Sequence, residues 1–275
     1  MEVILHKPDT GMPRGVVDPA GAAGRIRMAT YASSIPLQPF VDYYWHVQWD
    51  LTGQAAQTQR VLPYPNAHLV FDAGATAIHG VVRGVFVREV EGAGRVFGVR
   101  FKPGGLRPFL AFPLARLADR TLPVDDVLKV DAAEAERRVL GQPDPQAMIA
   151  AVESMLLAVL PAFDPRALLA EQAIEAAAAA NGPLSAHALA AQVEMEERSL
   201  QRLFSNYVGV SPKWVIQRFR LQEASWRLAA QGVVDLSALA ADLGFFDQAH
   251  FTSNFTRLVG QSPLAYWKSQ QAASI

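Results

Sequence analysis

The first half of the chain alternates apolar and polar positions with a period of two. In the segment 40–51, FVDYYWHVQWDL, alternate residues form a more apolar and a more polar set: Val41, Tyr43, Trp45, Val47 and Trp49, against Asp42, Tyr44, His46, Gln48 and Asp50. This period, carried by aromatic and β-branched residues, predicts a half-buried strand. Further strands are predicted in three segments: AHLVFDAG from Ala67, AIHGVVRGVFVREVEG from Ala77 and GRVFGVRFKPGG from Gly94. Several strands before any long helix indicate an antiparallel β sheet or a small barrel.

After Lys102 the period changes to that of a helix. Residues 106–121 predict a short helix broken at Pro113, and longer helical patterns begin with cap signals at Asp131, Asp144 and Asp164. The predicted fold class is therefore α+β, with an N-terminal antiparallel β sheet or small barrel and its helices followed by an all-α region. We place the boundary at Asp164, between domains of residues 1–163 and 164–275. The Gly-, Pro- and Ala-rich segment 7–24 is expected to be a mobile arm or a long loop.

Two short helices joined by a tight turn are predicted near the C-terminus. Asp235 is a good N-cap for the first helix, and Gly244 ends it. Asp247 caps the second helix, which ends at Gly260 and carries one apolar stripe: Phe251, Phe255, Leu258 and Val259. A helix, a turn with Gly and a helix with a polar outer face form the unit that places its second helix in a DNA major groove.

This helix-turn-helix pattern occurs twice. Six residues of the first copy lie 51 positions before their equivalents in the second: Leu200, Phe204, Val208, Gly209, Ser211 and Pro212, before Phe251, Phe255, Val259, Gly260, Ser262 and Pro263. Upstream, Leu189 lies only 50 positions before Leu239, so the second copy has one extra residue in its turn. Such a repeat indicates two copies of one supersecondary unit, joined here by a predicted helix over 212–230. Large aromatic residues of both copies and of the joining helix are expected in the core: Phe204, Trp214, Trp226, Phe251 and Phe255.

The phrases RLFSNYVGVSP in the first copy and ADLGFFDQAHFTSNFTRLVGQSP in the second resemble the AraC/XylS family of bacterial transcription regulators. The resemblance covers about the last 110 residues, and the motif residues, their order and the joining helix all agree. It implies a double helix-turn-helix domain of about seven helices that enters successive major-groove segments on one face of the duplex. The phrases PFVDYYWHVQWD, RVLPYPNAHLVFD and RVFGVRFKPGGLRPFL are similar to an uncharacterised domain often found ahead of AraC-type domains. That similarity implies a regulatory half without naming its ligand.

The resemblance also implies base-reading residues in the second helix of each copy. In the second copy, those on or near the groove face are Gln248, His250, Thr252, Ser253 and Asn254. Gln and Asn can pair bidentately with adenine, while Ser, Thr and His offer single hydrogen bonds. Arg257 is expected at a phosphate, which positions the helix without specifying a base. The alternative is that these residues are only the solvated side of an amphipathic helix.

The matching positions in the first copy are Arg198, Ser199, Gln201 and Arg202. Arg is the commonest specific reader of guanine, and Gln201 suits an adenine. This copy departs from the family pattern where a small residue and a Ser cap are usual, because it has the run EMEE from Glu194 to Glu197. Glu is a poor N-cap and its carboxylate repels phosphates, although its charge favours the positive end of a helix. The sequence leaves open whether the first copy engages DNA.

Composition adds two constraints. The chain has 275 residues, enough for two domains with cores, and no cysteine, which excludes disulfides and thiolate metal sites. Without a secretion signal or a run near the roughly 18 residues of a membrane span, a cytoplasmic location is expected. From Pro165 to the end there are nine Lys and Arg and nine Asp and Glu, so the predicted DNA-binding half has no basic excess. Binding would then depend on clustered basic residues, on helix N-termini or on a second subunit.

The expected partners are double-stranded DNA, an unknown small-molecule effector, RNA polymerase and a second copy of the chain; no cofactor, no metal and no membrane contact is expected. The helices over 131–160 would serve dimerisation or cover the sheet. Aromatic and polar residues of the N-terminal half are typical of an effector pocket and equally of core aromatics with surface arginines: Trp45, Tyr64, His68, Arg83 and Arg100.

Two other functions compete with a regulator. An enzyme or metal protein would use acidic and histidine residues of the β half: His46, His68, His79, Asp72 and Glu89. None of them has close ligand spacing, and the sequence lacks a Gly-rich phosphate loop, a Gly-x-Ser-x-Gly motif and an HExxH motif. We therefore predict that the protein is not an enzyme. A protein-interaction module without DNA binding is the second competitor, and the neutral charge of the C-terminal half favours it.

Overall fold

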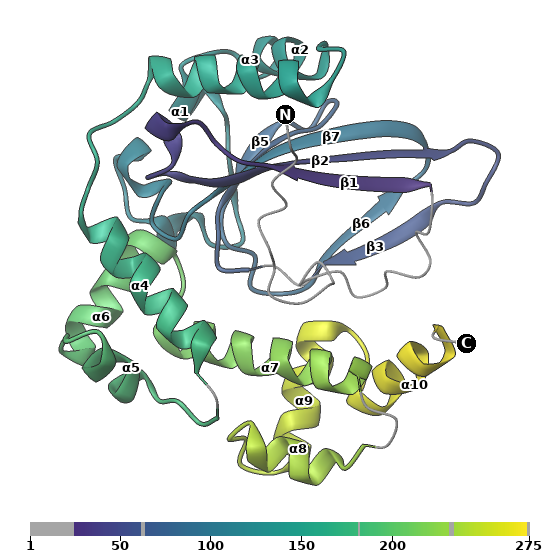
Figure 1. The fold of residues 1–275 in the computed structure, drawn as a ribbon, viewed down its shortest axis with the longest axis vertical. Helices are drawn as coiled ribbons and strands as arrows, with labels where there is room; N and C mark the ends of the chain where they lie inside the picture. Colours follow the sequence, from purple (N-terminus) through teal and green to yellow (C-terminus); the bar gives the residue numbers. More distant parts are fainter. Residues whose placement is uncertain (1–24, 62–63, 181, 231–233, 274–275) are drawn as a thin grey trace.

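The fold is that of a computed structural model, which describes residues 25–61, 64–180, 182–230 and 234–273 (Figure 1). The arm predicted over 7–24 lies outside the described residues. A β-rich N-terminal half is followed by a helical C-terminal half, so the predicted α+β class is confirmed.

The N-terminal half contains a six-stranded sheet and a separate two-stranded ribbon. The sheet has the order β1-β2-β7-β4-β5-β8, the ribbon consists of β3 and β6, and every neighbouring pair is antiparallel. The strands are β1 (Ile26–Tyr31), β2 (Val41–Leu51), β3 (Gln57–Val61), β4 (His68–Phe71), β5 (Ala77–His79), β6 (Phe86–Val90), β7 (Gly92–Phe101) and β8 (Thr121–Leu122). The ribbon lies below the sheet in Figure 1. The antiparallel sheet predicted from the period of two is therefore present.

Strand β2 is covered on both faces, which the alternation alone did not predict. Its register shifts at a bulge between Val41 and Tyr43, and Tyr44 is fully buried, with its ring stacked on Phe97. On the other face Trp49 packs with Val90 of β6 in a second, smaller cluster. The alternation therefore does not divide β2 into a core set and a solvent set, because Tyr44 of the more polar set and Val41 of the apolar set both belong to the main core.

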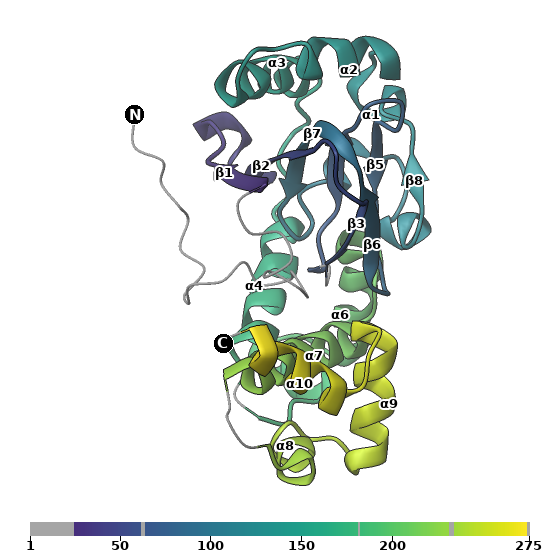
Figure 2. The same cartoon turned by 90° about the vertical axis from the view of Figure 1, so that its right-hand side faces the viewer.

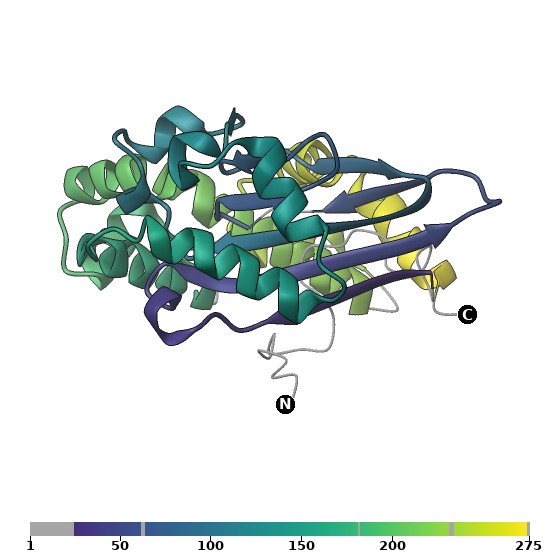
Figure 3. The ribbon, with the colours of Figure 1, turned by 90° about the horizontal axis from the view of Figure 1, so that it is seen from above.

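The main core lies between the sheet and three helices. These are α1 (Asp125–Leu128), α2 (Ala132–Leu140) and α3 (Pro145–Ala158). Asp131 and Asp144 accept hydrogen bonds from the first-turn amides of α2 and α3, as their sequence positions predicted. Seen from above, α2 and α3 lie over the sheet (Figure 3). The helix predicted over 106–121 is instead two 3₁₀ turns, η2 (Arg107–Phe109) and η3 (Leu114–Leu117), because Pro108 and Pro113 prevent a continuous helix.

The C-terminal half has seven α-helices within the described residues, in agreement with the predicted number. They are α4 (Arg166–Ala179), α5 (Ala186–Gln192), α6 (Glu197–Leu203), α7 (Pro212–Ala230), α8 (Leu236–Asp242), α9 (Gln248–Val259) and α10 (Pro263–Ala273). A single π turn, η4 (Phe204–Val208), continues α6. None of the helices in the described ranges is long and apolar enough to cross a membrane.

The two halves are in contact through a short 3₁₀ turn and a loop. Turn η3 of the N-terminal half packs against η4, and a Cβ built on Gly209 would lie 3.1 Å from the carbonyl oxygen of Leu114. The ring of Tyr64 meets Phe219 of α7 edge to face, with 5.1 Å between centroids. The predicted boundary at Asp164 falls between α3 and α4, but Val81 of the N-terminal half belongs to the core cluster of α4 to α7. The division into two domains at this residue stays a prediction.

Candidate nucleic-acid interface

Helices α5 and α6 form a first helix-turn-helix unit, and α8 and α9 form a second. Ser185 caps α5, and Asp235 caps α8 by accepting from the amides of Ser237 and Ala238 at 2.9 and 3.0 Å. The carboxylate of Asp247 accepts from the amide of His250 at 2.7 Å and starts α9. The caps at Asp235 and Asp247 explain why α8 and α9 begin where the sequence predicted.

The repeated residues form two separate cores. Leu200, Phe204 and Val208 are buried in the first, and Phe251, Phe255 and Val259 are buried in the second. Most of the predicted aromatic core is therefore correct. Trp226 is the exception, because 49% of it is exposed on the outer side of α7, and Trp214 is half-buried. A helix of 19 residues that joins two units has faces that touch neither of them.

Helix α7 holds the two units at a fixed separation through one arginine. Arg220 donates to the carbonyl oxygen of Leu184, just before α5, at 2.5 Å and to that of Gly244, in the second turn, at 3.3 Å. Gly244 has φ +71°, and a Cβ on it would lie 2.8 Å from Pro183, so the two units touch at this point. Arg220 is not recognisable from the sequence, because one charged residue on a long helix carries no periodic signal.

The outer face of α9 carries most of the predicted readers. Gln248, His250, Ser253 and Arg257 are exposed, and Thr252 is partly exposed. The ring of His250 also lies edge-on to the buried ring of Phe245, at 5.7 Å between centroids. The arrangement gives hydrogen-bond donors and acceptors along one helix face, beginning at its N-terminal end.

Asn254 does not lie on that face, so its prediction as a base reader is wrong. Only 5% of it is exposed. Its Oδ1 accepts from Gln217 of α7 at 2.6 Å and from Arg257, and its Nδ2 donates to the carbonyl oxygen of His250 at 2.8 Å. The repeat contained the signal, because the residue 51 positions earlier is Leu203, a core residue. Asn254 therefore joins α9 to α7.

The first unit presents its predicted readers differently. Arg198, Gln201 and Arg202 are exposed on α6, and Ser199 is half-buried. Gln201 donates to the carboxylate of Glu197 at 3.1 Å, and Arg202 donates to the hydroxyl of Ser199 at 3.3 Å. These readers are thus engaged with neighbours on their own helix.

The turn of the first unit also lacks a side-chain cap. Glu196 stands at the N-cap position of α6 without a capping hydrogen bond, and Glu194 adopts φ +54° where the second unit has Gly244. Both carboxylates are exposed beside the predicted readers. Figure 2 shows α6 and α9 toward the same side of the C-terminal half, with α8 toward the other.

In the N-terminal half, four of the five residues considered for an effector site lie on one face of the sheet. Trp45 donates to Nδ1 of His68 at 3.2 Å, and the guanidinium of Arg100 lies 4.5 Å from the ring centroid of Tyr64. Burial, with smaller effects of Arg100 and His79, lowers the pKa of His68 to about 3, so its imidazole is neutral. Arg83 lies elsewhere, paired with Asp119.

Arg100 is part of the framework of that face. It donates to the hydroxyl of Tyr43 at 2.7 Å and to Oδ1 of Asn66 at 3.1 Å, and it is paired with Asp42 at 3.1 Å. Through these three neighbours the guanidinium of Arg100 joins β7 to β2 and to Asn66, which precedes β4.

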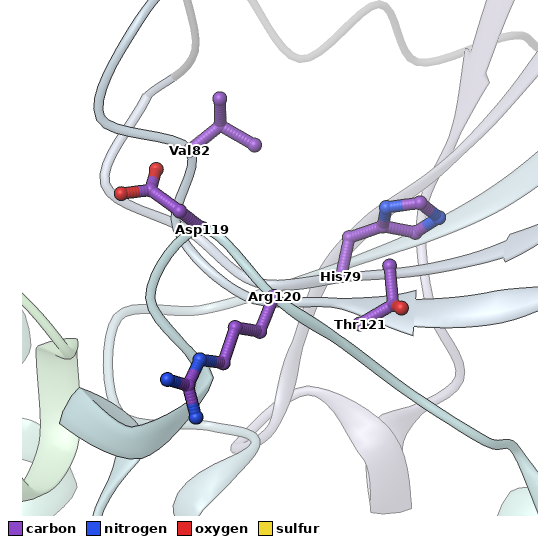
Figure 4. A pocket seen from close by; sticks show the side chains of 5 residues that line it. All are labelled: His79, Val82, Asp119, Arg120 and Thr121. Carbon is purple, nitrogen blue, oxygen red and sulfur yellow. The ribbon is translucent and has the colours of Figure 1, made fainter.

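An open depression of about 520 Å³ lies at the edge of the sheet (Figure 4). Its lining residues are His79, Val82, Asp119, Arg120 and Thr121. Figure 4 shows the side chains of Asp119 and Arg120 directed away from His79 and away from each other, so they form no convergent set. In the ranges that the structure describes, no three His, Asp or Glu side chains gather in a way that could hold a metal ion.

Comparisons with known proteins match both halves of the chain. Residues 189–269 match a family described as a helix-turn-helix domain, and residues 29–123 match a domain of unknown function (DUF6597). An uncharacterized HTH-type transcriptional regulator of Haemophilus influenzae is 32% identical over 81 residues, which are 30% of this chain and 27% of that protein. The chain thus aligns with about a quarter of the length of that relative.

Two solved structures are also similar to the chain. One is a transcriptional regulator with an AraC-type DNA-binding domain from Chromobacterium violaceum, at 27% identity, covering 36% of this chain and 88% of that one, with a TM-score of 0.33. The other is the DNA-binding domain of AdpA in complex with a target DNA, at 26% identity, covering 40% of this chain and 95% of that one, with a TM-score of 0.32. Together with the duplicated units, the match over residues 189–269 shows that the C-terminal half of this chain contains a helix-turn-helix domain, similar in sequence to part of a transcriptional regulator.

Proposed function

We propose that the protein is a sequence-specific DNA-binding transcriptional regulator whose two helix-turn-helix units read adjacent major-groove segments. One observation carries the proposal: two copies of the unit, each with an exposed polar recognition helix, are held at a fixed separation by Arg220 of α7. A fixed separation is what two recognition helices need to enter successive segments of one face of the duplex.

In this proposal the second unit supplies most of the base contacts. Gln248 is at the exposed N-terminal end of α9 and pairs with an adenine, while His250 and Ser253 give single hydrogen bonds. Arg257 contacts a phosphate, and its bond to Asn254 orients its guanidinium. In the first unit, Arg198 reads a base, and Gln201 and Arg202 do so once their hydrogen bonds to Glu197 and Ser199 are exchanged for contacts with DNA.

The balanced charge of the C-terminal half limits the electrostatic part of binding. With nine basic and nine acidic residues after Asp164, the half gains less from phosphate neutralisation than a basic domain does. The capped N-terminus of α9 and a second subunit would compensate for this. Homodimerisation, and contact with RNA polymerase at the promoter, are accordingly part of the proposal.

We further infer that an effector bound by the N-terminal half modulates the DNA-binding half. The support is the contact of η3 with η4, because η4 directly continues the first recognition helix. A small displacement of η3 therefore acts on α6 without crossing a flexible linker. This route would be tested by screening small molecules for a shift in the melting temperature of the full chain.

Selection of duplexes from a random pool by the purified full chain tests the proposal of DNA binding. We expect enrichment of a bipartite sequence, with its two parts about one helical turn apart. The affinity of the selected duplex is then measured between 50 and 200 mM salt, where few phosphate contacts predict a loss of about 10- to 100-fold. Failure to enrich any sequence, with only weak and sequence-independent binding, would contradict the proposal and favour a protein-interaction module.

A further inference from the structure

Phe246 is the most exposed large hydrophobic side chain of the described residues. It is 92% exposed, whereas the next in order, Ile35 in the N-terminal half, is 80% exposed. Placing an aromatic ring in water forgoes the burial that stabilises most such residues. Phe246 is located in the turn of the second unit, immediately before the cap residue of α9.

The backbone around Phe246 is fixed, so the exposure is not that of a loose loop. On one side Phe245 donates its amide to the carbonyl oxygen of Ala240 at 2.9 Å, and its ring lies 5.2 Å from the ring of Phe251. On the other side the carboxylate of Asp247 caps α9. Phe246 is thus held between a core residue and a capped helix.

Phe246 is also the extra residue of the second turn. Met195 donates its amide to Ala190 at 2.9 Å, just as Phe245 does to Ala240, and these residues are 50 positions apart. The cap positions Glu196 and Asp247 are 51 positions apart. One residue lies between Phe245 and Asp247 and none between Met195 and Glu196. The first unit therefore has no equivalent of Phe246.

The surroundings of Phe246 indicate what it contacts. After the cap residue Asp247, which is also exposed, come the exposed residues Gln248 and Ala249, at the N-terminal end of the second recognition helix. That end of a recognition helix meets the edges of bases. The C5-methyl of thymine is the apolar group that the major groove presents, and a Phe side chain is one of its known contacts.

We propose that Phe246 reads the C5-methyl group of a thymine beside the base that Gln248 contacts. The inference rests on the proposed function, since it requires α9 to enter the groove. It adds an apolar determinant of specificity that the first unit does not have, and it gives the exposed ring an apolar partner.

Replacement of thymine by deoxyuridine tests this directly, because it removes only the methyl group. The full chain first selects a duplex, and each thymine of the segment bound by the second unit is then replaced in turn. We expect the affinity of the wild type to fall about fourfold at one position, since one methyl group is worth roughly 0.8 kcal/mol. Phe246→Ala should bind the thymine duplex about tenfold less tightly and should no longer distinguish thymine from deoxyuridine there.

Two further variants serve as controls. Phe246→Leu keeps an apolar group and should retain part of the discrimination, while Ile35→Ala removes an exposed apolar side chain from the other half and should behave as the wild type. Melting of all variants shows whether they are folded.

Two outcomes would overturn the inference. One is equal sensitivity of the wild type and of Phe246→Ala to deoxyuridine. The other is unchanged DNA binding by Phe246→Ala with reduced transcription, which would assign the ring to a protein partner. If the wild type selects no duplex, the proposed function itself fails and the inference with it.

Discussion

The two helix-turn-helix units have equivalent cores and different surroundings. Phe204 of the first and Phe255 of the second are both completely buried. Beyond these cores, the first unit continues into η4, which packs against η3 of the N-terminal half. The second unit instead exposes a capped helix with a polar outer face.

The turns show the same divergence. The second unit has Gly244 in the left-handed region, an extra Phe246 and a capping Asp247, whereas the first has Glu194 in the left-handed region and Glu196 without a capping bond. A duplicated motif can thus keep its packing while its surfaces acquire separate tasks. The contact of η4 with η3 of the N-terminal half belongs to the first unit, and we assign the greater part of DNA reading to the second.

The largest effect is expected from matched truncations of the two cores. Phe204→Ala and Phe255→Ala should each lower the free energy of unfolding by about 3–5 kcal/mol, because each leaves a cavity. The cores differ in extent, since Val81 of the N-terminal half is a buried member of the cluster of Phe204, whereas Val85 is only partly buried at the edge of the cluster of Phe255. Hydrogen exchange should therefore report loss of protection in η3 as well as in α4 to η4 for Phe204→Ala, and in the C-terminal part of α7 and in α8 to α10 for Phe255→Ala. The same pattern for both variants would contradict the division of tasks.

The glycines that follow each recognition helix give the next test. Gly209 and Gly260 have φ of +96° and +84°, so alanine is strained at both. Gly209 faces the N-terminal half, where a Cβ would lie 3.1 Å from the carbonyl oxygen of Leu114. We expect about 1–2 kcal/mol of destabilisation for Gly260→Ala and about 2–4 kcal/mol for Gly209→Ala, measured by denaturant unfolding. Equal values would show that the contact between η3 and η4 adds nothing.

Matched substitutions of the readers compare the units on DNA. Gln248→Ala and Arg202→Ala should each weaken binding of the selected duplex by about 1–3 kcal/mol and relax preference at one base pair. The larger loss is expected for Gln248, because Arg202 is engaged with Ser199 and lies near exposed carboxylates. Binding is measured on the selected duplex and on random DNA. A residue whose loss weakens both duplexes equally is a phosphate contact.

The smallest effect is expected at the two caps. Asp247→Ala removes the bond to the amide of His250 and should cost about 1 kcal/mol of stability in the second unit. Glu196→Ala removes no capping bond and should cost no more than a few tenths of a kcal/mol. Melting temperatures of the two variants measure the difference. Equal decreases in melting temperature for the two variants would contradict the difference between the two caps.

Local chemistry made the helices of the C-terminal half predictable. Helix caps and helix-ending glycines act within one turn of a helix, as at Asp235, Asp247, Gly244 and Gly260. The repeat also shows the same buried apolar stripe in two places of the sequence. Where sequence reasoning failed, the cause was a neighbour distant in sequence. Asn254 looked like a groove residue because its partner Gln217 lies 37 positions away on another helix.

Two predictions about packing were wrong for the same reason. Trp226 was assigned to the core because of its size, yet α7 turns that side chain away from both units. In β2, the alternation indicated a strand correctly but not which face meets the main core, since the ring of Tyr44 and the bulge near Val41 decided this. The size of a side chain and the period of the pattern show that burial would be favourable. Whether the side chain is buried depends on helices and strands that are distant in the sequence and pack against it.

The sequence by itself determined the α+β class, the duplicated helix-turn-helix units and the residue types available to meet DNA, because periodicity, caps and glycines act over a few residues. The tertiary structure alone decided which polar side chains are free to meet a ligand and how the units are spaced. Three contacts join segments that are far apart along the chain. Arg220 donates to carbonyl groups of two loops, Asn254 bonds to Gln217 of another helix, and η3 packs against η4. Such contacts depend on how complete elements pack, and no window of neighbouring residues contains that information.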